Sequence, residues 1–266
     1  MSPRTILAAL AVLILTAVPG TSHEFWIEPQ EYQVQSGTPL VADFRNGQNF
    51  KGIALAYFSK QTARFDLGRN GQFTAVTGRM GDVPALQATA PDDGLLVIVH
   101  QTAPSTLRYA TWEKFQNFAD HKDFPDIRSR HLARGLPEQG FSERYTRFVK
   151  ALVAVGHGRG HDTPTGMETE FVALSNPYTD DPKNGVRVRL LYQGLPRADA
   201  QVEVFERGPD GAVSVRLLRT ESSGETTVPV RPAHTYLLDA VVLREMPEGS
   251  PQVWESLWAG ISFAVP

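Results

Sequence analysis

The 266-residue chain contains no cysteine. Disulfide bonds and thiolate metal sites are therefore excluded, and a transition-metal site would have to use nitrogen or oxygen donors. The formal net charge is -3, and it becomes -4 without residues 1–22, which carry one arginine and no acid. A charge so close to neutral indicates neither a nucleic-acid partner nor an anionic membrane surface.

The sequence also lacks the common catalytic motifs. No G-x-S-x-G elbow, P-loop, Rossmann fingerprint or H-E-x-x-H pair occurs. The acidic pairs Asp92-Asp93 and Asp180-Asp181 stand beside turn-forming residues, and they are more typical of turns than of an acid/base couple or a calcium site. We therefore expect a protein that is not an enzyme.

The amino-terminal segment has the pattern of a cleavable signal peptide. Arg4 precedes an apolar run of 14 residues, Thr5–Val18, and small residues follow as far as Ser22. A transmembrane anchor would need about 20 apolar residues. We predict a signal peptide over residues 1–22, a mature protein that begins at His23, and a periplasmic location.

Two segments of the remaining chain are predicted to form β-sandwiches. Turn signals such as Asn46-Gly47 and Asn70-Gly71 separate short strand patterns in the first segment, residues 23–105. The strands expected there are Leu40–Phe44, Ile53–Phe58, Arg64–Leu67, Gln72–Val76 and Leu95–His100. In the second segment, residues 161–266, the expected strands are Val186–Tyr192, Gln201–Arg207, Val213–Arg219, Glu225–Val230, Tyr236–Leu243 and Trp254–Val265. The fold class is mainly β, with two immunoglobulin- or transthyretin-like sandwiches.

The segment between them, residues 106–160, is predicted to be a helical insertion and linker. Helical spacing of aromatic and apolar residues occurs over Thr111–Lys122 and over Ser142–Val155. Ser142 is the expected N-cap of the second helix, and Gly156 its C-terminal stop. A glycine-rich connector, residues 156–166, leads out of the insertion.

Removal of residues 1–22 would give His23 both a free α-amine and an imidazole. The amine nitrogen and Nδ1 can chelate one metal ion, and one more imidazole would complete a histidine brace. The reference pKa of the amine is about 7.7–8, so a divalent cation can displace its proton near neutral pH. Such donors suit Cu, Ni, Co and Zn better than Mg or Ca. A cut after Gly20 would instead place His23 third, which also creates a square-planar Cu(II) or Ni(II) site.

Three other histidines are candidates for the additional ligand. His100 ends the last strand of the first sandwich, and His121 and His131 lie in the insertion. They could approach His23 if the insertion folds over the edge of the sandwich. His157 and His161 alternate with glycines and are expected in a solvated linker. His234 is expected in a turn.

Several segments resemble the NikK-like periplasmic family, the accessory proteins of nickel and cobalt uptake systems. The matching segments are HEFWIEP (His23–Pro29), GLLVIVHQT (Gly94–Thr102), ERYTRFVKALVAVG (Glu143–Gly156), EFVALSNPY (Glu170–Tyr178), RVRLLYQGLPRADAQVEVFER (Arg187–Arg207) and WESLWAGISF (Trp254–Phe263). The resemblance implies that His23 binds nickel or cobalt outside the inner membrane and that the protein supports an inner-membrane metal-uptake transporter.

Two further hypotheses belong to other functional classes. A copper histidine brace on a β-sandwich is also the architecture of lytic polysaccharide monooxygenases, which would make the protein a redox enzyme. Tandem sandwiches also serve as structural or adhesion modules, in which a bound metal would be incidental. The leading expectation is a metal-binding protein with His23, His100, His121 and His131 as candidate ligands and nickel, cobalt or copper as the ion.

Overall fold

The computed structural model describes residues 23–266, so the predicted signal peptide lies outside the described residues. Strands make up 51% of the described residues and helices 9%. The prediction of a mainly β fold with sandwich packing is confirmed. Within residues 23–266 no helix combines the length and apolar character needed to cross a membrane.

Along residues 23–266, one short α-helical segment separates two groups of nine strands. Before it come β1 (Glu24–Pro29), β2 (Gln33–Val34), β3 (Pro39–Gln48), β4 (Lys51–Leu55), β5 (Thr62–Arg69), β6 (Gln72–Ala75), β7 (Leu86–Thr89), β8 (Gly94–Thr102) and β9 (Ser105–Tyr109). The helices are α1 (Trp112–His121) and α2 (Ile127–Ala133). After them come β10 (Phe141–Val155), β11 (Thr169–Ala173), β12 (Val186–Tyr192), β13 (Leu195–Pro196), β14 (Gln201–Arg207), β15 (Val213–Arg219), β16 (Glu225–Val228), β17 (His234–Glu245) and β18 (Trp254–Val265).

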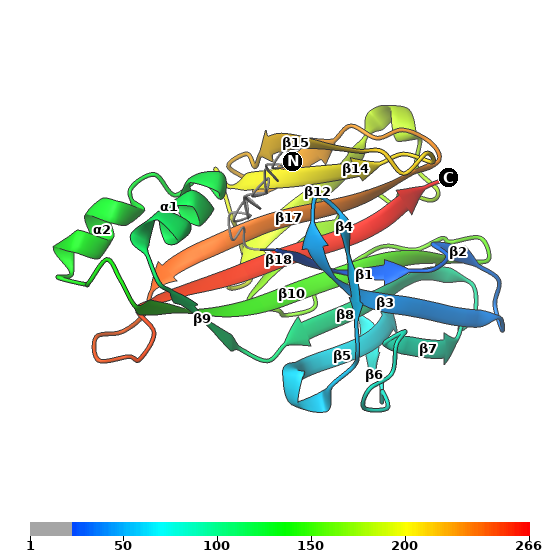
Figure 1. Ribbon diagram of the computed structural model, residues 1–266. Helices are drawn as coiled ribbons and strands as arrows, with labels where there is room; N and C mark the ends of the chain where they lie inside the picture. Colours follow the sequence, from blue (N-terminus) through cyan, green and yellow to red (C-terminus); the bar gives the residue numbers. More distant parts are fainter. Residues whose placement is uncertain (1–22) are drawn as a thin grey trace, which may run out of the picture.

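A long central sheet runs through the molecule in the order β15-β14-β17-β18-β10-β8-β5-β6, with β2 and β9 also paired to β10. Its strands come from both predicted sandwich segments, and β10 and β18 lie side by side in its middle (Figure 1). The N-terminal sheet is β1-β3-β4 with β7 beside β3, and the C-terminal sheet is β11-β12-β13 with β16 beside β12. The two sandwiches thus share one sheet.

Side-chain alternation on the central strands explains this three-layer arrangement, because successive residues of a strand face opposite ways. On β8, Leu95 and Val97 belong to the core under the C-terminal sheet, whereas Leu96 and Ile98 belong to the core under the N-terminal sheet. Both faces of the central sheet are therefore covered, which requires the nearly continuous apolar run seen in β8.

The predicted helix at Ser142–Val155 is wrong, because these residues form most of strand β10. Phe148 and Leu152 contact one core, and Val149 and Val153 contact the other. Because both faces of this strand are buried, nearly every position over residues 148–155 is apolar. Apolar residues therefore also occur at the three- and four-residue spacings that are typical of a helix. Gly156 is accordingly not a helix stop, but a residue with φ of +55° at the end of β10.

The predicted helix at Thr111–Lys122 is confirmed as α1, and α2 follows it at a position where no helix was expected. Phe115 and Phe118 of α1 and Ile127 of α2 pack on Trp254 and Trp258 of β18. Trp254, Trp258 and Ser262 are even numbers of residues apart on β18, so their side chains project from the same face of the central sheet. Ser262 donates a hydrogen bond to the carbonyl of Ile27 in β1, so this face also carries the N-terminal sheet. The helices and the N-terminal sheet thus lie on the same face.

Candidate functional site

A strip of the central sheet lies between the N-terminal sheet and α1, and we call this strip the seam. Its side chains are Glu203 of β14, Asp239 of β17, Trp258 of β18 and Arg147 of β10. Glu203 is directly opposite Asp239, and Arg147 is directly opposite Trp258. Two carboxylates facing each other across neighbouring strands repel one another, so this pair requires a cation.

Lys122, the residue that follows α1, supplies that cation. Its Nζ donates to Oε2 of Glu203 and to Oδ2 of Asp239, the latter at 2.8 Å, and it lies 4.7 Å from the centre of the Trp258 ring. All three charged side chains are buried. Burial lowers the pKa of the Lys122 ammonium, but the negative charges of Asp239 and Glu203 have a larger effect, so the pKa is raised. The contact fixes the end of α1 against the sheet.

Glu24, the first residue of β1, brings a third carboxyl group to the same place. Burial raises its pKa to about 7, and the charge of Asp239 adds to this effect. One of its oxygens accepts a hydrogen bond from the backbone N–H of Asn49 at 3.0 Å. The exposed His23 directly precedes Glu24. The predicted mature amino terminus therefore stands at the edge of the seam.

His121 reaches the seam from the last turn of α1. Its Nε2 lies 2.8 Å from Oε1 of Glu203, a buried oxygen that has no other polar partner among residues 23–266. The contact with Glu203 raises the pKa of His121, to which the charge of Glu24 also contributes. The imidazole side chain remains 62% exposed. His121 is therefore the predicted ligand that the fold places beside the start of β1.

His100 lies in a different, apolar environment. Its ring centre is 4.0 Å from that of Phe44 and within 6 Å of those of Phe25 and Phe65. Its Nε2 is 3.3 Å from Oγ1 of Thr62, and its buried Nδ1 has no hydrogen-bond partner in the described part of the chain. Burial lowers the pKa of His100 to about 3, so the ring is neutral.

His131 has no nitrogen free to bind a metal ion. Nδ1 accepts a hydrogen bond from the indole N–H of Trp254 at 3.0 Å, and Nε2 lies 3.0 Å from the carbonyl oxygen of Pro137, to which it donates. The ring is fully buried between α2 and β18. It fixes the helices to the sheet.

The four predicted ligands do not form one cluster. In the described residues, no group of three or more His, Asp or Glu side chains is arranged to hold a metal ion. His100 packs against Phe44, His131 against Trp254, and His121 contacts Glu203. Among residues 23–266, His121 lies close enough to the start of β1 for the charge of Glu24 to raise its pKa.

The remaining histidines lie outside the seam. His157 and His161 are exposed in the connector, where Nδ1 of His157 accepts the backbone N–H of Arg159 at 3.0 Å. Nδ1 of His234 lies 2.7 Å from the carbonyl oxygen of Pro232, and His234 is the first residue of β17, directly after the turn where it was expected.

Sequence reasoning missed the charged residues of the seam. Asp239 stands within an apolar stretch of β17, whereas Glu203 and Arg147 lie in strands that carry other charged residues. A charge in the interior of a buried strand must be paired or bind something, so it is a usable sequence signal. Lys122 could not be identified in this way, because it follows a helix that contains both charged and apolar residues, where one more charge is not unusual.

Comparison with known proteins identifies a family but no activity. Residues 21–244 match the family described as a domain of unknown function, DUF4198. No curated protein matches significantly.

Solved structures with some likeness include a tetra-tandem repeat from the extending region of a large adhesion protein. It is 8% identical over 91% of this chain and 49% of that chain, with a TM-score of 0.23. An alpha-2-macroglobulin mutant from Salmonella is 13% identical over 96% of this chain and 16% of that chain, with a TM-score of 0.25. The chain thus spans about half of the first and less than a fifth of the second.

Proposed function

We propose that this chain, which belongs to the DUF4198 family, is an exported protein that binds Ni(II) or Co(II) at its mature amino terminus. The proposed ligands are the α-amine and imidazole of His23, with the imidazole of His121 and Oε1 of Glu203. Residues 23–266 hold no ready-made group of three such side chains, so the ion would have to draw the exposed His23 toward the other two. The observation that carries the proposal is the contact between His121 and an otherwise unpartnered buried oxygen of Glu203, beside the first strand of the mature chain.

The donor set fits a divalent transition metal. Two donor atoms bound at right angles to one ion, each at about 2.0–2.2 Å, are separated by about 3 Å. Nε2 of His121 and Oε1 of Glu203 are 2.8 Å apart. The other oxygen of Glu203 is bound by Lys122. This arrangement holds the carboxylate in place, as the outer-shell partners of metal ligands do.

The missing donors are those that signal-peptide removal would create. Before cleavage the nitrogen of His23 is an amide, which does not provide an amine lone pair. After cleavage the amine and imidazole of one residue would complete a set of three nitrogens and one oxygen. Imidazole, amine and carboxylate donors are suitable ligands for Ni(II) and Co(II).

The proposed role is capture and transfer rather than catalysis. The exposed side chains of His23 and His121 leave the ion accessible from solvent. An open site suits a protein that hands its cargo to another, and the NikK-like sequence segments favour an inner-membrane uptake transporter as that partner. The proposed location is the periplasm.

The test compares two proteins that differ only at the amino terminus. One begins at His23, verified by mass, and the other carries a single Met before His23. Calorimetric titration with Ni(II) and Co(II) should give submicromolar binding to the first. Since loss of an outer-shell partner already weakens metal binding about 10–100-fold, loss of the amine donor should weaken it by more than about 100-fold.

Equal binding to both proteins would contradict the terminal site, and no binding to either would contradict the function. Titration with Cu(II) is expected to give tighter binding because copper leads the affinity order. Affinity therefore cannot identify the metal that the protein carries naturally. That metal is identified by metal analysis of the protein isolated from its own periplasm. Nickel or cobalt at one ion per chain supports the proposal. Copper alone would instead favour the redox enzyme.

A further inference from the structure

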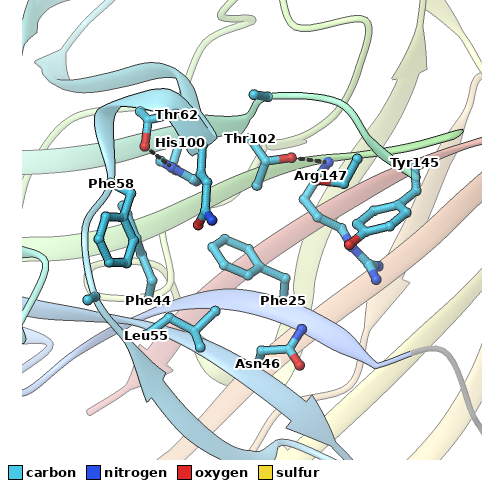
Figure 2. A pocket seen from close by; sticks show the side chains of 14 residues that line it. Phe25, Phe44, Asn46, Leu55, Phe58, Thr62, His100, Thr102, Tyr145 and Arg147 are labelled. Atoms are coloured by element: carbon cyan, nitrogen blue, oxygen red, sulfur yellow. Dashed lines mark hydrogen bonds between the residues drawn. The ribbon is translucent and has the colours of Figure 1, made fainter. Parts of the chain in front are cut away.

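A second candidate site adjoins the seam, in a pocket between the N-terminal sheet and the central sheet. Figure 2 shows Arg147 and Tyr145 on one side of it and His100 and Thr62 on the other. The pocket has a volume of about 200 Å³, and its wall is rich in aromatic side chains, including Phe25, Phe44 and Phe58. Pockets for drug-sized ligands measure roughly 300–1,000 Å³, so this pocket suits a compact molecule.

Arg147 brings a positive charge to the pocket wall, and Asp239, Glu143 and Glu24 act on it from beyond ion-pair distance. The residue is only 6% exposed, and its guanidinium lies 3.7 Å from the centre of the Trp258 ring. Among residues 23–266 the guanidinium has no ion pair within 4.0 Å and no hydrogen bond, and its Nη1 is completely buried. A buried charge without a hydrogen-bonded partner is costly, so this group is expected to receive an anion.

The rest of the pocket wall carries no competing charge. Of the described residues that line it, Arg147 alone is charged at neutral pH, and none is an aspartate or glutamate. His100 contributes a neutral ring whose buried Nδ1 has no partner in the described part of the chain. The backbone N–H of Arg147 donates to Oγ1 of Thr102 at 3.0 Å, which fixes the strand that carries the guanidinium. Nη1 of Arg147 and Nδ1 of His100 lie beneath the pocket wall, so a ligand would meet the other nitrogens of the guanidinium.

We propose that this pocket binds a small organic carboxylate with an aromatic or apolar body. The carboxylate would pair with the guanidinium of Arg147, whose planar fork matches a carboxylate. The apolar body would lie among Phe25, Phe44 and Phe58. A phosphate is disfavoured because it would bring nearly two negative charges to one cation and place them against aromatic walls.

This site shares no proposed ligand with the metal site, although Arg147 is one of the side chains of the seam. It uses neither His23 nor His121, and the metal proposal uses neither Arg147 nor His100. Binding of a carboxylate is therefore expected to persist in the presence of a chelator. Failure of either proposal leaves the other standing.

The experiment uses benzoate, phenylacetate and butyrate as probes, with benzyl alcohol and inorganic phosphate as controls, on the chain beginning at His23. Binding is followed by calorimetry and by tryptophan fluorescence, which should respond because Arg147 stacks on Trp258. Benzoate or phenylacetate should bind more tightly than benzyl alcohol and phosphate. Arg147→Gln should weaken carboxylate binding at least about 10-fold, since hydrogen bonds to charged groups are the strong ones.

The matched control is Arg108→Gln, which changes an exposed arginine of β9 outside the pocket. It should leave carboxylate binding unchanged. If Arg147→Gln does not fold, Phe58→Ala serves instead, because Phe58 is 40% exposed and its loss should weaken the aromatic acids but not butyrate. The proposal is overturned if none of the three acids binds, if phosphate binds as well as they do, or if both the Arg147 and Phe58 variants bind them normally.

Discussion

Two buried lysines pack against the central sheet and each contacts two carboxylates, yet their surroundings differ. Lys150 of β10 faces the C-terminal sheet, where its Nζ lies 3.2 Å from Asp162, 2.9 Å from Glu170 and 3.1 Å from the carbonyl oxygen of Thr163. Lys122 lies in the seam on the opposite face, between Glu203 and Asp239. We call these groups the Lys150 cluster and the Lys122 cluster.

In the Lys150 cluster every carboxylate oxygen has a partner. Asp162 accepts the backbone N–H groups of Thr163 and Ala173, and Glu170 accepts those of Thr165 and Gly166. These bonds hold the glycine-rich connector against the sheet, although its composition suggested a solvated linker. The cluster is closed, and its role is to fix the chain.

The Lys122 cluster is incomplete by comparison. One oxygen of Glu203 has only the exposed His121 beside it, and Glu24 adds a carboxyl group whose pKa is raised to about 7. Arg147, nearby, has no ion pair in the described chain. Buried charge occurs in both clusters, so the proposal of a site at the Lys122 cluster rests on its exposed histidine and on the polar atoms left unpaired among residues 23–266.

The largest effect is expected from breaking the closed cluster. Lys150→Met leaves Asp162 and Glu170 buried without their cation and should lower the free energy of unfolding by about 3–5 kcal/mol. Urea denaturation at pH 7.5 measures this change, and nickel binding should be unchanged in the folded variant. A loss below 1 kcal/mol would contradict the closed, structural role of this cluster.

The corresponding change in the seam should cost less. Lys122→Met should lower the free energy of unfolding by about 1–3 kcal/mol, because Asp239 accepts no backbone N–H and can take up a proton more readily than Asp162. The loss should shrink as pH falls from 8 to 6, which denaturation at several pH values will show. A loss equal to that of Lys150→Met, and independent of pH, would remove the distinction between the clusters.

The smallest effect is expected at Glu24. The folded chain keeps its proton up to a pH of about 7, whereas the unfolded chain releases it near 4.5. Stability should therefore fall as pH rises through this window. Glu24→Gln should remove that fall and stabilise the protein at pH 8 by about 1–2 kcal/mol. Thermal unfolding from pH 4.5 to 8 tests it, and a destabilised variant at pH 8 would show that the ionised carboxylate is needed.

The sequence predicted most of the strands because their turns and alternation are local signals. Four predicted strands coincide with observed elements to the residue, namely β12, β14, β15 and β18. The helix predicted over β10 was wrong because burial on both faces depends on two other sheets, which no local pattern reveals. The shared central sheet could not be predicted for the same reason.

The candidate site was predicted only in part. His121 was identified as a candidate ligand, but so were His100 and His131, whose surroundings are set by aromatic residues distant in sequence. Pairing of Lys122 with Glu203 and Asp239 joins residues 81 and 117 positions apart. Such contacts follow from strand order, which composition and spacing do not determine.

The most direct test of the metal proposal compares two histidine substitutions in protein that begins at His23. His121 in the seam and His157 in the connector are both solvent-accessible, so neither His121→Ala nor His157→Ala should impair folding. Titration with Ni(II) should show affinity reduced more than about 10-fold for His121→Ala, consistent with loss of a ligand, and unchanged for His157→Ala. Unchanged affinity in His121→Ala would contradict the assignment of the seam as the metal site.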